Sequence, residues 1–274
     1  MVKKTFKEMI GDAIKTLLSH PYNFLRRLCF YTGAVVLSLI TALVLVAVVY
    51  FYTLPPIETM SFETLKTLAK THVRDELKDK KKQYKWVPLA KVNRDYLYTI
   101  VMAEDSNFFQ HNGINYDALL NSLAENIKKK EFAYGASTIT QQVAKNIFLS
   151  KEKTLLRKLR EYSITKALEK HFSKNQILEI YLNIVELGND IYGVRAASWN
   201  HFGKYPSQIN AGEGALIALL LPSPRRYAYS IFQNRHLSPS NEKKYIRILK
   251  DMRYHEFISP EQYNHYRNFE RILK

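Results

Sequence analysis

The stretch LYTIVMAEDSNFFQHNG, residues 97–113, joins a helix to a polar turn and is the most informative part of this 274-residue chain. Leu97, Ile100 and Val101 recur at helical spacing and lead into Glu104. A carboxylate beside apolar rings loses hydration, which raises its pKa toward a value useful for a general base. On spacing alone, an ordinary helix-end carboxylate or a surface ion pair explains this glutamate better.

A second motif, GASTITQQ at residues 135–142, begins another helix. Gly135 permits close backbone approach, and Thr138 with Gln141 has the form of a capping box. An uncovered helix N-terminus presents N–H groups and a positive dipole end to an anion, and Lys145 adds a full charge two turns later. A simply well-capped helix explains the same residues, and both interpretations stay open.

A third motif, RKLRE at residues 157–161, places Arg157 and Glu161 one helical turn apart. The pair is either a surface ion pair worth roughly 0.3–0.5 kcal/mol, or a second carboxylate held by cations. In the second case Lys153 and Arg157 are available to bind a diphosphate, and the planar guanidinium suits phosphate oxygens.

The N-terminal part of the chain predicts a membrane anchor. Residues 28–57 carry no charge, and 30–52 would span about 34 Å as a helix, enough to cross a bilayer. A cleaved signal peptide is less favoured, because its apolar region is shorter and no cleavage site follows. Basic residues before the span predict that the N-terminus stays in the cytoplasm.

The net charge of +16 predicts an acidic partner, namely a nucleic acid, an anionic membrane surface or a phosphorylated substrate. One cysteine permits no zinc-finger spacing, and no aromatic RNA-binding signature is present, so no nucleic-acid partner is expected.

Beyond residue 86 the pattern is helical almost throughout, which predicts a mostly α fold. Two more capping boxes are Ser173 with Gln176 and Asn210 with Glu213, and the last begins a buried core helix that stops at Pro222. The predicted organisation is a cytoplasmic segment (1–29), a transmembrane helix (30–52), a charged stalk or linker (53–85) and a helical domain (86–274).

With these motifs in this order, the chain resembles the peptidoglycan glycosyltransferases (glycosyltransferase family 51) in their monofunctional, membrane-anchored form. The resemblance covers residues 86–255 and rests on the three motifs above together with KNQILEIYLN (174–183), YGVRAA (192–197), FGK (202–204) and LPSPRR (221–226).

The resemblance implies a lysozyme-like helical fold and polymerisation of lipid II into β-1,4-linked glycan strands, with inversion and release of undecaprenyl diphosphate. Glu104 would be the catalytic base and Glu161 would assist at the donor site. The substrate-binding residues it implies are Asp105, Phe108, His111, Gly113, Gly135, Ser137, Thr138, Gln141, Gln142, Lys145, Lys153, Arg157, Lys158, Tyr181 and Asn183.

The family also implies a divalent ion, Mg²⁺ or Mn²⁺, bridging the diphosphate and reached by Glu104 or Glu161, with no organic cofactor. Expected partners are lipid II, the growing glycan strand, the membrane and other cell-wall synthesis proteins. The catalytic domain is expected on the outer (periplasmic) face of the cytoplasmic membrane. A transpeptidase domain is not expected, because the Ser-x-x-Lys patterns at 150–153 and 163–166 lack a following Lys-Thr-Gly.

Two other functions fit parts of the pattern. A hydrolase of finished glycan would also use a helical domain with a catalytic glutamate, but it releases no diphosphate for the cations to bind. A catalytically silent anchor in a cell-wall assembly has no need of both glutamates. A further hypothesis is that Phe132, Tyr134, Ile147, Phe148 and Leu149 place the donor site against the bilayer, with ordinary core packing as the alternative.

Overall fold

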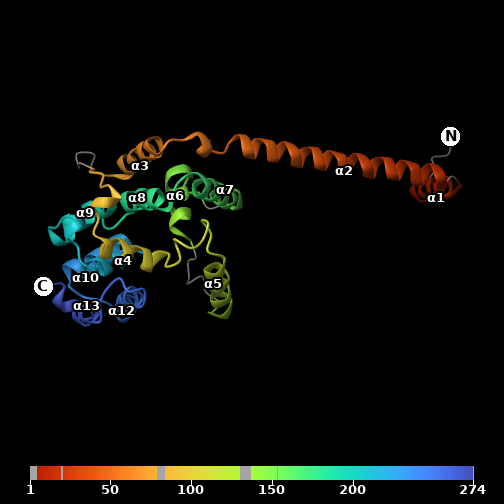
Figure 1. The fold of residues 1–274 in the computed structure, drawn as a ribbon. Coiled ribbons are helices and arrows are strands. Elements are labelled where there is room, and N and C mark those ends of the chain that lie inside the picture. The colour runs from red at the N-terminus through yellow and green to blue at the C-terminus, as the bar shows by residue number, and fades with distance from the viewer. Residues whose placement is uncertain (1–4, 20, 79–83, 130–136, 153, 274) are drawn as a thin grey trace. The chain divides into compact units, whose positions relative to one another are not determined.

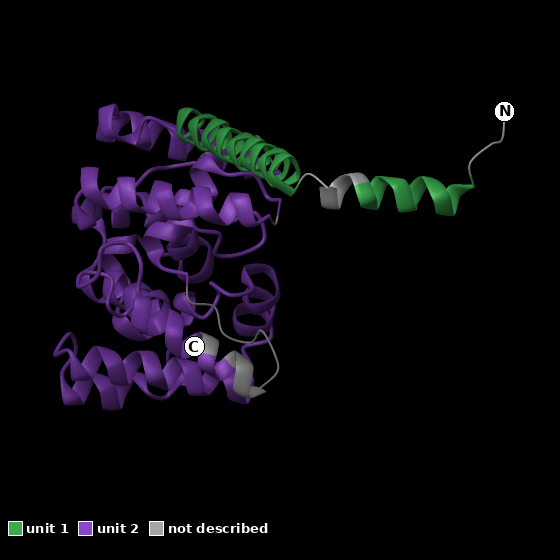
Figure 2. Cartoon of the chain, turned by 90° about the vertical axis from the view of Figure 1, so that its right-hand side faces the viewer, with its two compact units in different colours: residues 1–54 green, residues 55–274 purple. Residues whose placement is uncertain are grey.

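The computed structural model of the chain describes residues 5–19, 21–78, 84–129, 137–152 and 154–273. Within these residues the chain is helical almost throughout, and the β-type pairing they contain is an isolated bridge between Glu186 and Tyr192. The predicted mostly α fold is therefore confirmed. The chain divides into two compact units, residues 1–54 and 55–274 (Figure 2).

Unit 1 consists of α1 (Phe6–Ser19) and the long helix α2 (Pro21–Tyr52) (Figure 1). None of the residues of α2 is buried, and the most apolar part of the segment has a mean hydropathy of 2.8. A helix of such residues is unfavourable in water and is long and apolar enough to cross a membrane. It begins nine residues before the predicted span, at Pro21.

Unit 2 is built around α4 (Arg94–Glu104), α8 (Lys174–Ile184) and α10 (Ala211–Ala218). Every residue of α10 is buried, and the helix packs against α4. Around them lie α3 (Phe62–Glu76), α5 (Tyr116–Lys129), α6 (Ile139–Phe148), α7 (Leu155–His171), α9 (Gly193–Phe202), α11 (Pro224–Ala228), α12 (Pro239–Tyr254) and α13 (Pro260–Tyr266) (Figure 1).

The three predicted capping boxes are all present. In each, the side chain of the first residue accepts the N–H of the third helical residue, whose side chain accepts the cap N–H in return. The buried core helix also forms, although α10 ends at Ala218 and not at Pro222.

The structure differs from the predicted stalk at residues 53–85. Leu65, Ala69 and Val73 of α3 are fully buried against α8, so this segment belongs to the core of unit 2. Their spacing of four residues forms an apolar stripe that the surrounding charges obscure in the sequence. Trp86 reinforces the contact, because its Nε1 donates to Glu179 over 2.9 Å. Residues 79–83 of the predicted stalk lie outside the described residues.

Candidate active site

Glu104 is the last residue of α4, where the helix delivers it beside α6. Its Oε2 accepts a hydrogen bond of 2.7 Å from Nε2 of Gln142. Burial raises the pKa of Glu104, and the Gln142 bond and the charges of Lys244 and Lys145 partly oppose that rise. A carboxylate held partly desolvated in this way has the properties of a general base.

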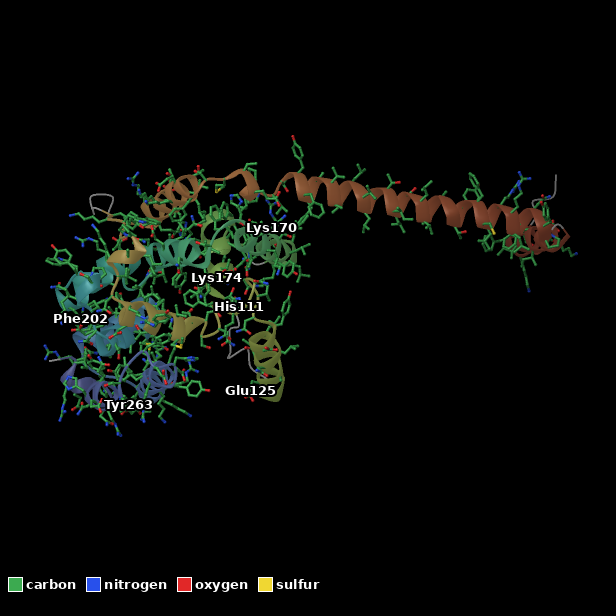
Figure 3. All side chains as sticks on the ribbon, in the orientation of Figure 1. His111, Glu125, Lys170, Lys174, Phe202 and Tyr263 are labelled. Atoms are coloured by element: carbon green, nitrogen blue, oxygen red, sulfur yellow. The ribbon has the colours of Figure 1, made fainter. Side chains whose placement is uncertain are left out.

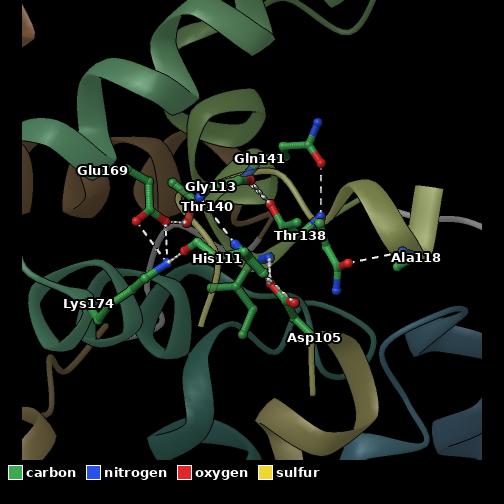
Figure 4. A network of polar contacts seen from close by, with 11 residues as sticks. Asp105, His111, Gly113, Ala118, Thr138, Thr140, Gln141, Glu169 and Lys174 are labelled. Atoms are coloured by element: carbon green, nitrogen blue, oxygen red, sulfur yellow. Dashed lines mark hydrogen bonds and ion pairs between the residues drawn. The ribbon is translucent and has the colours of Figure 1, made fainter. Parts of the chain in front are cut away.

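Asp105 follows directly and is buried, but it faces a different partner. Its Oδ2 accepts the N–H of Ile139, the first residue of α6, over 3.1 Å (Figure 4). Nδ1 of His111 accepts the N–H of Gly113, so the ring proton is on Nε2 and is donated to Asp105 over 2.8 Å. The first N–H of α6 is therefore bonded to a carboxylate of the protein itself, and the predicted cap at Thr138 is present as well.

Gly113 has a structural reason to be glycine. Its φ is +86°, and a Cβ there would lie 2.8 Å from side-chain atoms of both Glu169 and Thr165. The Gly113 carbonyl accepts the Thr138 hydroxyl over 2.6 Å. This turn thus packs directly against α7 and the start of α6.

Lys174 and Glu169 support the same turn, and sequence reasoning gave them no role. Lys174 lies near His111 (Figure 3), and its Nζ donates to the His111 carbonyl over 2.6 Å and contacts Glu169 at 2.8 Å (Figure 4). The same Nζ lies 4.4 Å from the centre of the Phe108 ring. Glu169 also accepts the hydroxyl of Thr140 on α6. Lys174 is the first residue of the KNQILEIYLN motif, and its place in that motif is the signal in the sequence that could have indicated its role.

Glu161 on α7 is the second carboxylate. Its side chain is 2% exposed and accepts Nη1 of Arg157 over 3.0 Å and Nζ of Lys158. The predicted turn-spaced ion pair is confirmed, with a buried carboxylate in place of a surface one. Nε of Arg157 is buried and has no hydrogen-bond partner within the described part of the chain.

Lys145 on α6 connects the two carboxylates electrostatically. Lys145 as a whole residue is exposed, but partial desolvation of its amine lowers the pKa of that amine. The negative charges of Glu161 and Glu104 oppose this shift. Lys145, Arg157 and Lys158 therefore form a positive cluster beside two acidic groups.

Three predicted substrate-binding residues, Phe108, Tyr181 and Asn183, lie beneath the site, whereas Thr138 lines the cavity beside Glu104. Phe108 and Tyr181 are fully buried, and the Asn183 amide is bonded to both backbone groups of Val87. The side chains of Thr138 and Gln141 form the hydrogen bonds of the α6 capping box. We therefore assign Phe108, Tyr181 and Asn183 to support of the site, and substrate binding by Thr138 and Gln141 stays a prediction. Gly135 and Lys153 lie outside the described residues.

A polar cavity of about 270 Å³ opens beside Glu104. Ser137 and Asn115 line one side of it, and Arg247 and Asp251 of α12 line another. Lys244 lies one turn before Arg247 and acts on Glu104 through its charge. No motif in the sequence marks α12, so these basic residues were missed.

The described residues contain no group of three or more histidine, cysteine, aspartate or glutamate side chains suited to a metal ion. Among these residues Glu104 accepts a hydrogen bond from Gln142, and Glu161 accepts hydrogen bonds from Arg157 and Lys158. A divalent ion carried by a diphosphate stays a prediction.

The chain has a helical fold whose candidate site brings together two carboxylates and a cluster of cations. A family model described as transglycosylase matches residues 70–253, and the chain belongs to this family.

Similar proteins include three biosynthetic peptidoglycan transglycosylases. That of Janthinobacterium sp. (strain Marseille) is 43% identical over 145 residues, covering 53% of this chain and 63% of the relative. That of Nitrosospira multiformis is 38% identical over 206 residues, covering 75% and 85%. That of Herminiimonas arsenicoxydans is 42% identical over 155 residues, covering 55% and 67%.

Proposed function

We propose that the chain is a peptidoglycan glycosyltransferase that polymerises lipid II into β-1,4-linked glycan strands. The observation that carries this proposal is the pairing of a desolvated base, Glu104, with the cations that surround Glu161.

In the proposed reaction, Glu104 takes the proton of the acceptor's 4-hydroxyl group. The acceptor oxygen forms a bond to the anomeric carbon of the donor, while the bond from that carbon to the diphosphate oxygen breaks. Attack from the face opposite the leaving group inverts the configuration, as in inverting glycosidases with an alcohol in place of water. The cavity beside Glu104 is where we place the acceptor.

The diphosphate leaves with negative charge, which Lys145, Arg157 and Lys158 would stabilise. The Nε of Arg157 supports this role, because it is buried without a partner among the described residues, and such a donor is suited to a ligand oxygen. Lys153 joins this group from its position in the sequence alone. The same cluster disfavours a hydrolase of finished glycan, whose reaction releases no diphosphate.

Helix α2 would anchor the enzyme in the cytoplasmic membrane, with its N-terminus in the cytoplasm and unit 2 on the outer face. Exposed leucines on α5 and α7 support a donor site close to the bilayer. They are Leu119, Leu120, Leu155, Leu156 and Leu159. Of the residues first considered for this contact, Ile147, Phe148 and Leu149 are partly exposed, and Phe132 and Tyr134 lie outside the described residues.

The test is a polymerisation assay with purified lipid II and the full chain in detergent. We expect wild-type protein to form glycan polymer and Glu104→Gln to lose about 10²–10⁴-fold in rate, with Glu161→Gln also impaired. Full activity of Glu104→Gln contradicts the assignment of the base. Degradation of pre-formed glycan without synthesis of polymer contradicts the transferase function.

A further inference from the structure

A second and larger cavity in unit 2, of about 810 Å³, has no role in the chemistry above. None of its lining residues surrounds Glu104 or Glu161. It lies between the end of α3, the segment that begins at Tyr84, the turn before α9, and α9 itself. The lining residues used below are Lys85, Asp190, Arg195, Trp199, Asn200 and Tyr205.

Aromatic rings form one wall of this cavity. The side chain of Trp199 is 59% exposed and that of Tyr205 is 49% exposed, with ring centroids 5.7 Å apart and a tilt of 48°. A large exposed indole gains little from folding, whereas its flat face suits the apolar C–H face of a sugar ring. Two neighbouring rings at this spacing offer such a face to a saccharide of more than one residue.

The charge of the cavity points to an anionic group on that saccharide. The guanidinium of Arg195 lies 4.9 Å from the centre of the Tyr205 ring, and neither Arg195 nor Lys85 has a carboxylate partner among the described residues. Asp190, which also lines the cavity, accepts the N–H of Lys78 over 2.8 Å and keeps its negative charge, so the cations Lys85 and Arg195 outnumber the acid of the lining. Two cations without a carboxylate partner therefore face a cavity with a polar amide, that of Asn200.

We propose that this cavity binds an N-acetylated amino-sugar segment that carries a carboxylate, which is the chemistry of a muramyl unit with its peptide. The sugar rings lie on Trp199 and Tyr205, and the carboxylate lies between Lys85 and Arg195. A cavity of this volume is within the usual range for a ligand of disaccharide size, about 300–1,000 Å³. The inference rests on the proposed function, because a glycan polymerase makes a product of this class.

The test measures binding to the full chain in detergent, with Glu104→Gln as background so that no turnover occurs. The probe is a soluble disaccharide–tetrapeptide, and isothermal titration calorimetry reports its affinity. We expect Trp199→Ala and Arg195→Gln each to weaken binding about tenfold or more. Tyr229→Ala, which removes another exposed ring of unit 2, is the matched control and should bind as the background protein does.

Two comparison probes identify the ligand class. A chitin disaccharide lacks the carboxylate and should bind weakly, with an affinity that Arg195→Gln leaves unchanged. The tetrapeptide alone should bind weakly as well. Equal affinity for tetrapeptide and disaccharide–tetrapeptide would make the cavity an acidic-peptide site and overturn the proposal. Unchanged affinity in both cavity variants would overturn it too.

The same variants separate this inference from the proposed function. In a wild-type background, Trp199→Ala should leave the initial rate of lipid II polymerisation unchanged. A protein that polymerises lipid II but does not bind the probe refutes the cavity inference alone. A protein that binds the probe but makes no polymer refutes the proposed function alone.

Discussion

The side-chain amide of Gln142 donates a hydrogen bond of 2.7 Å to the carboxylate of Glu104. The bond joins α6 to the end of α4 across 38 positions of sequence, and it favours the charged form of an acid that burial disfavours. The protonation of the proposed base is therefore adjusted from a neighbouring helix.

Replacing Gln142 with methionine keeps the volume of the side chain and removes its hydrogen bond. The pKa of Glu104 should rise, so the acid limb of the pH profile of kcat/KM should move to higher pH. Hydrogen bonds to charged groups contribute about 1.5–3 kcal/mol, so the loss of activity should be greatest on the acid limb and should shrink as the pH rises above it. Gln110→Met, at an exposed position of the adjacent turn, is the control. An acid limb that stays in place would show that the amide does not govern Glu104.

Lys244 acts on the same carboxylate from α12, because its charge lowers the pKa of Glu104. Lys244→Met should therefore also move the acid limb to higher pH, with the loss of rate greatest on that limb. Lys243→Met removes an exposed charge from the neighbouring position of α12. A pH profile of polymerisation for both variants tests the effect of Lys244 on Glu104. Equal shifts of the acid limb in the two variants would show that only the net charge of the protein matters.

The buried base should also weaken the fold at neutral pH. Because burial raises the pKa of Glu104 above its ordinary value of 4.5, the protonated form stabilises the folded state, and this contribution is lost as pH rises through the folded-state pKa. Glu104→Gln should therefore have a higher Tm than wild type at pH 7, and the difference should shrink below pH 4.5. Thermal unfolding at the two pH values measures this, and a lower Tm at pH 7 contradicts it.

Two glycines with positive φ allow crowding to be separated from backbone strain. A Cβ at Gly113 would meet Glu169 and Thr165 at 2.8 Å, whereas a Cβ at Gly203, with φ of +65°, meets no atom within 4 Å. Gly203→Ala should cost about 1–2 kcal/mol of unfolding free energy, the penalty of a left-handed backbone. Gly113→Ala should cost more and should reduce polymerisation as well. Urea unfolding of both variants measures the difference. Equal losses of unfolding free energy would show that crowding at Gly113 has no effect on stability.

Local signals in the sequence predicted local structure well. The cap at Thr138 depends on a residue three positions away, and the Arg157–Glu161 pair depends on one helical turn, so both are readable without the fold. The apolar run at residues 30–52 likewise predicts a spanning helix by its own composition.

Contacts between distant segments were not readable in this way. The bond from Ile139 to Asp105 joins residues 34 positions apart in the sequence. Lys244 acts on Glu104 although helices α5 to α11 lie between them in the sequence. These contacts depend on how helices pack, which spacing within one helix does not specify. The burial of α3 was missed for a different reason, because charged residues surround its local apolar stripe and the sequence does not show that α8 covers it.

The carboxylate of Asp105 at the start of α6 has a consequence for how the enzyme would release its product. Because the first N–H of that helix is bonded to the protein, the proposed leaving diphosphate would depend on side-chain cations, of which Lys158 is about half exposed. Charges open to solvent are screened by dissolved ions within a distance of about 10 Å at 0.1 M salt. Donor affinity and product dissociation would then vary with the ionic strength outside the membrane, and one enzyme would work at different speeds in dilute and in saline surroundings.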